Sequence, residues 1–297
     1  MRYIKSFICL ILVLLLLSSC GITQGDLDQS VASSQTVSNG TDLKATIVDG
    51  ILSDGQLIEN STPRIYNDPD APKTMTIEFE GETYIGTYED TVYDVYRTKQ
   101  HHNYVFTNGG FDVDVNDGSF LGINFENKAD ENPPISIEER KIIAEDIAKK
   151  YIDVSKYVLE IDENYEFFTK YVYARYFNGY KTNEELLIVL RKSGEIMRVN
   201  LCDIGSFDSI DSKKKVSAEY IKELNSEKGE KAATDKVVSL AKDGWAHEKT
   251  KKGPMFALSD GTVTVGYEVT MIKTYPDLSH EGYAIVESTI YYVLVSN

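Results

Sequence analysis

The stretch NPPISIEERKIIAEDIAKKYIDV, residues 132–154, decides the fold. Its apolar residues recur at the spacing of a helix, whereas those before it alternate as in a strand. Ser136 can cap this helix, and Glu139, three residues later, can reach back to it, which is the pattern of a capping box. One face then carries the apolar side chains Ile143, Ala144, Ile147, Ala148 and Tyr151. The spacing predicts an α-helix that begins after Ser136 and packs one side against a sheet.

An antiparallel meander is predicted directly after this helix. The segment NYEFFTKYVYARYF (164–177) alternates, EELLIVLR (184–191) is almost continuously apolar, and EIMRVNLCDIG (195–205) returns to alternation. The turns NGYKTN (178–183) and KSG (192–194) separate these strands. Helix and meander together predict an α+β fold.

Strand patterns also occur on both sides of this region. Residues 74–125 alternate with period two between Gly, Asp and Asn turns, and strands resume at residue 261, broken by a turn at PDLSHEG (276–282). A second helical region is predicted from about Ser217 to Lys242, interrupted near SEKGEK, where Gly229 weakens it. Its predicted apolar face includes Val237, Val238, Leu240 and Ala241.

Residues 135–205 resemble the PepSY and YcdB-like modules of bacterial envelope proteins. The matching features are an aromatic strand ending in Arg175, the Asn178-Gly179 turn, the apolar strand 186–190 and the turn 192–194. Residues 217–297 repeat this order more loosely. The resemblance implies antiparallel β-meanders, each packed by an α-helix as in cystatin-like folds, arranged as tandem modules. It also implies a role in restraining or regulating enzymes outside the membrane, without catalytic residues of its own.

The N-terminal stretch LVLLLLSSCG (12–21) ends an apolar run that begins at Phe7, after a short basic start. This run is too short for a transmembrane helix, which needs about 20 apolar residues, and has the length of a secretory signal. Residues 17–20, LSSC, resemble the lipobox of bacterial lipoproteins. The resemblance implies that Cys20 receives a diacylglycerol and that the signal is cut off before it. An ordinary signal peptide with an incidental cysteine is the alternative.

The patterns together predict five parts. Residues 21–43 are rich in Ser, Gln, Thr, Gly and Asp and lack periodic apolar positions, which is typical of a flexible tether. The predicted parts are a signal peptide (1–19), a lipidated disordered tether (20–44), a strand-rich module (45–130), a helix-plus-sheet module (131–212) and a second one (213–297). The predicted location is the extracytoplasmic face of the cell membrane, with the membrane reached through the lipid on Cys20.

Composition agrees with an exported globular protein. Of 297 residues, 42% are hydrophobic and 26% charged, with 47 acidic against 31 basic residues and a net charge of -16. Such a surface repels nucleic acid and anionic lipid headgroups, so nucleic acid is excluded as a partner. It tolerates cationic partners and divalent ions.

The histidines do not complete a catalytic or metal motif. The metalloprotease motif HExxH needs two histidines one helical turn apart. After His247 the place of the second histidine is taken by Lys251, and after His280 it is taken by Ala284. On a strand, the adjacent pair His101-His102 points to opposite faces, and no third ligand follows at a suitable spacing. We interpret that pair as a surface feature.

Other candidate motifs also have simpler interpretations. Cys202, the one thiol left after signal removal and lipidation, follows an apolar run and is expected to be a buried small hydrophobe beside Asp203. The SxxK spacing at residues 212–215 arises from a run of three lysines and is interpreted as a linker. The stretch DVDVNDG, Asp112 to Gly118, begins like an EF-hand loop, but its glycine comes one place late and Ile123 replaces the bidentate glutamate. We interpret it as a strand entering a turn, with a weak calcium site as the alternative.

Many of the twenty tyrosines lie on predicted strands. Tyr171 and Tyr173 fall on one face, where they either grip a sugar or peptide or fill the core beneath the helix. We favour the core, because tyrosine suits half-buried strand positions.

The predicted function is that of a lipid-anchored, non-enzymatic envelope protein that binds or restrains a peptide, a peptidase or another wall-associated partner. No catalytic residue, metal ligand or cofactor is predicted, and the sequence assigns no ligand-binding residues. A solute-binding lipoprotein is the first alternative, although the repeated parallel βαβ units of a two-lobed receptor are missing from the patterns. An envelope hydrolase with an unrecognised site is the second.

Overall fold

The computed structural model describes residues 43–50, 64–126, 132–208, 210, 216–241, 244–258, 260–280 and 283–296. Residues 41–297 form one compact unit. The predicted signal peptide, Cys20, nearly all of the predicted tether and the lysine run up to Lys215 lie outside the described residues. The predicted module boundaries near residues 130 and 212 also adjoin undescribed segments, so they stay predictions.

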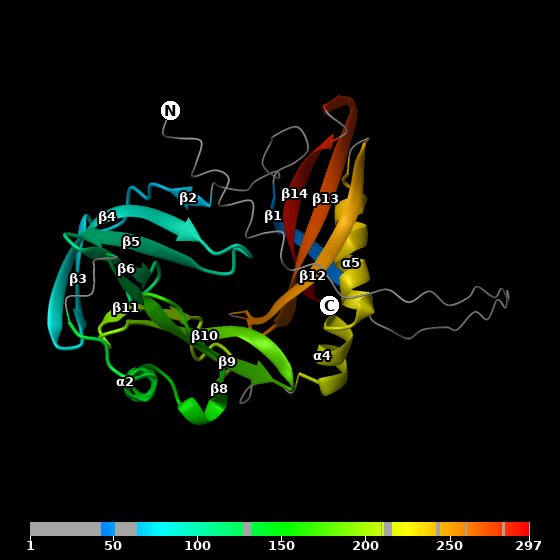
Figure 1. Cartoon of the computed structure of the whole chain (residues 1–297). Helices are drawn as coiled ribbons and strands as arrows, with labels where there is room; N and C mark the ends of the chain where they lie inside the picture. The colour runs from blue at the N-terminus through cyan, green and yellow to red at the C-terminus, as the bar shows by residue number, and fades with distance from the viewer. Residues whose placement is uncertain are drawn as a thin grey trace. The chain divides into compact units, whose positions relative to one another are not determined.

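The described chain is dominated by one extended sheet of fourteen strands (Figure 1). These are β1 (Lys44–Asp49), β2 (Ile65–Tyr66), β3 (Thr74–Phe79), β4 (Glu82–Tyr93), β5 (Gln100–Phe106), β6 (Gly109–Asp114), β7 (Phe120–Phe125), β8 (Tyr157–Asn164), β9 (Phe168–Phe177), β10 (Tyr180–Arg191), β11 (Ile196–Cys202), β12 (Trp245–Ala257), β13 (Val263–His280) and β14 (Tyr283–Ser296). The predicted strands of residues 74–125 and of the central meander are confirmed.

The hydrogen-bonded order of the sheet is β1-β14-β13-β12-β10-β11-β7-β6-β5-β4-β2, with β3 on β4 and with β9 and then β8 added beside β10. Every pair is antiparallel except β10 with β12, which meet in parallel at Thr182 and Met255. That one parallel bridge joins β12 to β14, together with β1, to the other ten strands of the described sheet.

The predicted fold of tandem helix-on-meander modules is wrong. The meander of β3 to β7 contains no helix among residues 64–126 and continues directly into the next strands, because β7 pairs with β11 through Ile123 and Val199. The first strand, β1, pairs with the last, β14. Local alternation of apolar and polar residues predicts where strands lie and which face of each is buried. It does not predict which strands distant in the chain pair with one another.

The predicted helix after Ser136 is confirmed as α2 (Ile137–Tyr151). The Ser136 hydroxyl accepts the Glu139 amide proton at 3.1 Å, and the Glu139 carboxylate accepts the Ser136 amide proton at 2.9 Å. A 3₁₀ turn, η1 (Val154–Lys156), follows it. The capping box therefore sets the start of the helix as the sequence predicts.

The second helical region is divided into α4 (Ala218–Leu224) and α5 (Glu227–Val238). The break falls before Ser226, whose side chain caps α5, while Gly229 lies buried within α5. A Cβ at Gly229 would overlap the Leu224 carbonyl and the Tyr267 hydroxyl, so glycine is required there by close packing. The predicted interruption is confirmed, but its cause is a cap and not the glycine.

The predicted apolar face of this region is only partly right. Val237 is buried, whereas Val238 and Leu240 are 45% and 50% exposed. The buried positions of α5 are Gly229, Ala233 and Val237. Their spacing of four residues leaves the next position, Val238, on the solvent side.

The predicted turn at residues 276–282 is too long. Strand β13 continues to His280, which pairs with Tyr283 of β14. Pro276 therefore lies within a strand, next to a shift in register between Tyr275 and His280. The predicted Asn178-Gly179 turn is confirmed, with φ of 50° and 83°.

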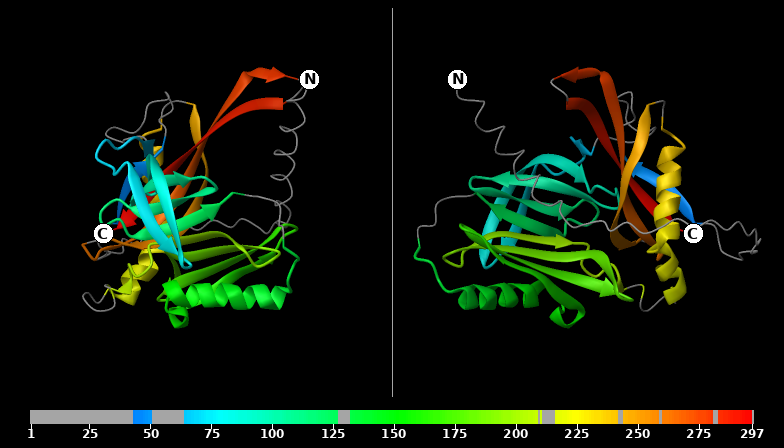
Figure 2. Two further views of the ribbon diagram at one scale, coloured as in Figure 1. Left: turned by 90° about the vertical axis from the view of Figure 1, so that its left-hand side faces the viewer. Right: turned by 45° about the vertical axis from the view of Figure 1, so that its right-hand side comes forward.

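Two hydrophobic cores support the sheet. The first combines α2 with side chains of β3 to β7 and β9 to β11, and the second combines α4 and α5 with β12 to β14. Tyr171 and Tyr173 are 0% and 5% exposed in the first core, so their interpretation as core residues is confirmed. Figure 2 shows α2 lying along β8 to β11 and α5 along the C-terminal strands. No helix in the described ranges has the length and apolarity to cross a bilayer.

Candidate binding cavity

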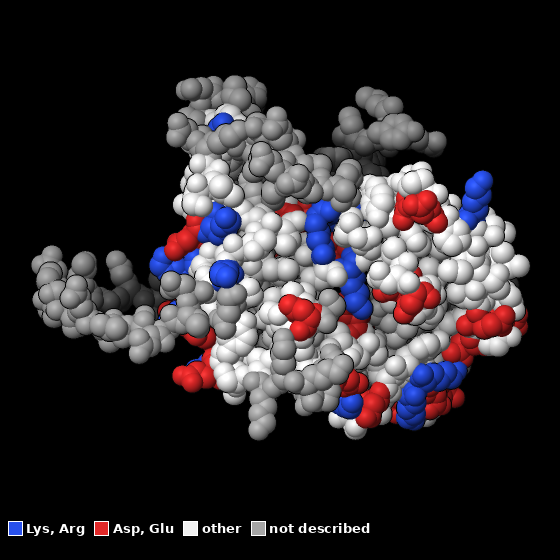
Figure 3. Space-filling view, turned by 180° about the vertical axis from the view of Figure 1, so that it is seen from behind, with Lys and Arg blue, Asp and Glu red and all other residues white. Residues whose placement is uncertain are grey.

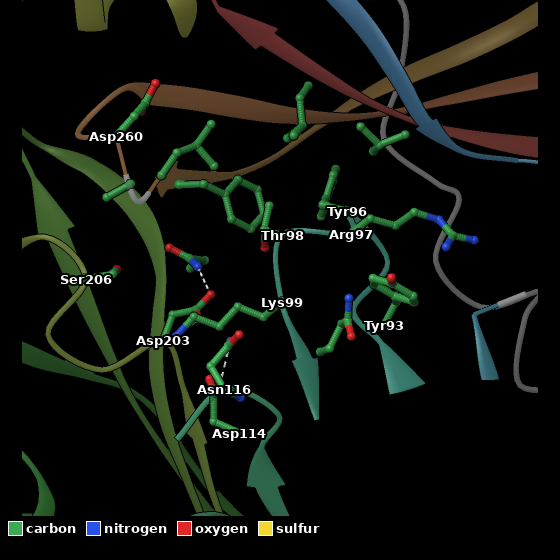
Figure 4. A pocket seen from close by; sticks show the side chains of 17 residues that line it. Tyr93, Tyr96, Arg97, Thr98, Lys99, Asp114, Asn116, Asp203, Ser206 and Asp260 are labelled. Atoms are coloured by element: carbon green, nitrogen blue, oxygen red, sulfur yellow. Dashed lines mark hydrogen bonds and ion pairs between the residues drawn. The ribbon is translucent and has the colours of Figure 1, made fainter. Parts of the chain in front are cut away.

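A cavity of about 930 Å³ is lined by residues on or beside β1, β12 and β14 and by residues on or beside β4, β5, β6 and β10. Its wall comes from the loop between β4 and β5, from the turn after β11 and from the loop between β12 and β13 (Figure 4). Apolar side chains, including Phe256, Leu258 and Leu294, alternate with charged and amide side chains. The turn after β11 and the β12–β13 loop belong to strands next to the β10–β12 bridge, whereas β4 and β5 stand farther along the sheet. The cavity therefore brings together loops from strands that are distant in the sheet order.

The loop from Asp94 to Lys99 is organised by one carboxylate. Asp94 accepts hydrogen bonds from the Tyr96 amide at 2.6 Å, the Thr98 hydroxyl at 2.8 Å and the Lys99 amide at 2.5 Å. Arg97, at the tip, has a left-handed φ of 54°. An aspartate that binds the amides following it is the side-chain mimic of a backbone turn. This turn places Thr98 and Lys99 on the cavity wall.

Tyr96 fixes this loop to the C-terminal strands. Its ring lies 5.0 Å from the ring of Phe256 and 5.4 Å from that of Tyr292, and the residue is 4% exposed. A Cβ at Gly253 or Gly266 would overlap the tyrosine ring, so both glycines leave space for it. Burial raises the pKa of the Tyr96 hydroxyl well above its ordinary value, so it stays protonated.

Opposite this loop, Asp203 follows β11 with a left-handed φ of 51°. The Lys99 ammonium lies 2.5 Å from its Oδ1, and the Asn183 amide group donates to its Oδ2. Burial raises the pKa of the Asp203 carboxyl, although Lys99 and Asn183 act in the opposite direction. Two non-glycine residues with left-handed backbone, Arg97 and Asp203, thus line one cavity, a kind of strain that clusters at functional sites.

The turn after Asp203 is held by a buried carboxylate. Glu184 of β10 is 0% exposed and lies beneath the turn. It accepts hydrogen bonds from the Tyr157 hydroxyl (2.6 Å), Arg175 (3.1 Å), the Gly205 amide (3.1 Å), the Ser206 hydroxyl (3.1 Å) and the Phe207 amide (2.5 Å). Because so many donors converge on one charge, this side of the cavity is rigid.

Charge on the cavity wall is slightly negative. Asp114, Asp203 and Asp260 line it together with two cations, Arg97 and Lys99. Arg97 also lies 3.5 Å from Asp49, just behind the wall. The view from behind shows acidic and basic side chains interspersed over the surface (Figure 3).

The sequence candidates relate to this cavity in different ways. The DVDVNDG stretch is a strand ending in a turn, as interpreted: Gly118 donates to the Asp114 carbonyl at 2.9 Å and has φ of 69°. Its Asp114 and Asn116 side chains reach the cavity wall. Among the residues that the structure describes, no group of three potential ligands gathers for a metal ion.

No histidine is among the described residues that line the cavity. The interpretation of His101-His102 as a surface pair is wrong for His102, which is 6% exposed and bonded to the Thr91 hydroxyl at 2.8 Å. His102 lies on the core side of a central strand of its meander, which is why it is covered. His247 is exposed and lies 2.9 Å from Thr250.

Cys202 is exposed, so the predicted burial is wrong. The residue is the last of β11, where it still pairs with Glu185 of β10 but lies two positions beyond the last residue paired with β7. Desolvation by nearby protein atoms and the Asp203 carboxylate raise the pKa of its thiol to about 11. The thiolate is therefore scarce at neutral pH, which argues against a nucleophile.

Sequence reasoning missed most of the cavity. Tyr96, Arg97 and Lys99 carried no motif, and Asp203 was noted only as the neighbour of a cysteine. One signal was present in the glycines of β12 and β13, since an isolated glycine within a strand marks the close approach of another group.

The fold and cavity define a β-sheet protein with a cavity of mixed polar and apolar lining. No family model matches the sequence, and no curated protein matches it either. Among solved structures, the chain is weakly similar to the Bacillus megaterium YpeB C-terminal domain. The two share 11% sequence identity over 72% of this chain and 88% of that chain, with a TM-score of 0.29. The resemblance to PepSY and YcdB-like modules stays a prediction.

Proposed function

We propose that this chain is a lipid-anchored protein of the cell envelope that binds a peptide segment of an envelope partner in the cavity, without converting it. The observation that carries the proposal is the cavity itself. Its volume of about 930 Å³ lies within the range of binding sites for small ligands, about 300–1,000 Å³.

The lining favours a peptide over an apolar ligand. Asn116, Asn183 and Gln100 supply amide groups, while Phe256 and Leu258 supply apolar area. A peptide presents N–H donors, carbonyl acceptors and side chains in close succession, so it needs a wall of this mixed kind.

The hydroxyl and carboxyl groups at the cavity favour binding over turnover. The Ser206 hydroxyl donates to Glu184, and Glu184 is committed to holding the turn. Nucleophilic catalysis needs a hydroxyl or thiol within reach of a free base. Among the described residues that line the cavity there is no histidine to act as that base.

Filling the cavity is expected to abolish peptide binding. Leu258→Trp places a large ring at the cavity wall, whereas Leu240→Trp makes the same change at an exposed position beyond α5. With the full-length chain in detergent and a panel of short peptides, isothermal titration is expected to show at least about tenfold weaker binding for Leu258→Trp alone. Thermal unfolding of both variants checks that each is folded.

Three results would count against this function. Equal binding by Leu258→Trp would place the peptide elsewhere. Tighter binding of single sugars or amino acids would favour the solute-binding alternative, and peptide cleavage would favour the hydrolase.

The membrane anchor is expected to depend on Cys20. In cells, Cys20→Ser is expected to remove incorporation of a labelled fatty acid and to block cutting before residue 20, because the lipid is attached to this thiol. Cys9→Ser, a change within the same signal, is expected to leave labelling and mass unchanged. Labelling of Cys20→Ser at the level of the unchanged chain would refute the anchor.

A further inference from the structure

We infer that the cavity selects peptides by a free ammonium group, which binds at Asp203 beside the side-chain carbonyl of Asn183. This inference rests on the proposed function and names the ligand group that the cavity recognises. The ammonium belongs to a peptide amino terminus, and the peptide lies along the mixed wall.

The first step is the orientation of Asn183. An ionised carboxylate only accepts hydrogen bonds, so Asn183 must turn its NH₂ group toward Asp203, as it does. Its Oδ1 atom is then buried on the cavity wall and accepts no hydrogen bond from any described residue. A buried acceptor without a donor is costly, by about 1–3 kcal/mol in general, and a ligand donor removes that cost.

The second step is that several donors around the cavity are already used. The Lys99 ammonium faces Asp203 at 2.5 Å, the Thr98 hydroxyl donates to Asp94, and the Asn116 amide donates to Asp114 at 3.0 Å. These three donors are therefore not free for a ligand, whereas the Asn183 Oδ1 acceptor has no partner among the described residues. Beside Asp203 and Asn183, a ligand that brings a hydrogen-bond donor complements the wall better than one that brings an acceptor.

The third step is charge. Three carboxylates line the cavity against two cations, and both cations already face carboxylates within the protein. An incoming anion would have to compete with Asp203 for Lys99 and with Asp49 for Arg97. An incoming cation meets surplus negative charge, and the net charge of -16 attracts it from a distance.

The electrostatics at Asp203 agree with this assignment. Burial raises the pKa of its carboxyl, and Asp94 adds to that effect. Both causes reflect a desolvated site with negative potential, where a second cation beside Lys99 stabilises the ionised carboxylate.

The test compares three forms of one peptide on the full-length chain in detergent. The probes are Ala-Ala-Ala amide, with a free ammonium group, N-acetyl-Ala-Ala-Ala amide, which is neutral, and N-acetyl-Ala-Ala-Ala acid, which is anionic. The free amine is expected to bind at least about tenfold more tightly than either acetylated form in isothermal titration, because a charge-assisted hydrogen bond is lost on acetylation.

Asp203→Asn is expected to remove the preference for the free amine. Asparagine is the replacement of choice because it tolerates the left-handed backbone at this position. Asp235→Asn removes the same charge from an exposed position on α5 and is expected to keep the preference.

The outcomes separate the inference from the proposed function. Equal or tighter binding of an acetylated form, or a preference that survives Asp203→Asn, overturns the inference while peptide binding stands. Absence of binding by all three probes overturns both.

Discussion

Replacing Glu184 by alanine is expected to lower the free energy of unfolding by about 3–5 kcal/mol. Glu184 is 0% exposed, so its removal takes the buried carboxylate partner from the Arg175 guanidinium, which keeps the half-exposed Asp208 carboxylate at 2.9 Å. The amides of Gly205 and Phe207 lose their acceptor as well. Urea unfolding of the full-length chain, followed by circular dichroism, measures the change.

The adjacent residue provides the control. Glu185 is also in β10, but its carboxylate is partly exposed and pairs with Lys181 at 2.6 Å. Glu185→Ala is expected to cost less than about 1 kcal/mol, because exposed ion pairs contribute little. Similar losses for both variants would mean that the buried network does not hold the turn after β11.

Replacing Tyr96 by alanine is expected to lower the free energy of unfolding by about 3–5 kcal/mol, as for other buried aromatic side chains. The substitution removes the ring that fills the space over Gly253 and Gly266 and that packs on Phe256. Because the loop from Asp94 to Lys99 is positioned by this ring, peptide binding is expected to weaken together with stability. Denaturant unfolding and isothermal titration measure the two effects.

The hydroxyl of Tyr96 gives an internal control. It is buried and forms no hydrogen bond with any described residue. Tyr96→Phe is therefore expected to change stability by less than about 1 kcal/mol, since no bond is lost. Tyr165→Ala, at an exposed tyrosine, is expected to be mild as well. A mild Tyr96→Ala variant would mean that the loop is not docked on the C-terminal strands.

The sequence predicted those parts of the fold whose causes are local. The capping box at Ser136 and Glu139 set the start of α2, and alternation located the strands of both meanders. The pairing of β7 with β11 and of β1 with β14 joins segments far apart in the chain. Alternation fixes the buried face of a strand but leaves its neighbours open, so the tandem arrangement inferred from it failed.

The sequence predicted less of the cavity than of the fold. The stretch from Asp112 to Gly118 was interpreted correctly as a strand entering a turn, but the sequence did not show that its Asp114 and Asn116 line the cavity. The roles of Tyr96, Glu184 and Asp203 depend on groups from other strands. Cys202 shows the same limit, because an apolar run does not reveal that its last residue is uncovered.

Hydrogen–deuterium exchange of the full-length chain, with and without saturating Ala-Ala-Ala amide, tests the central claim that the cavity is the ligand-binding site. The account predicts slower exchange on peptide binding in three segments, residues 94–99, 203–206 and 256–258, which contribute to the cavity wall. Slower exchange confined to other segments, such as β3 or β8, or no change under conditions where the peptide is bound, would contradict it.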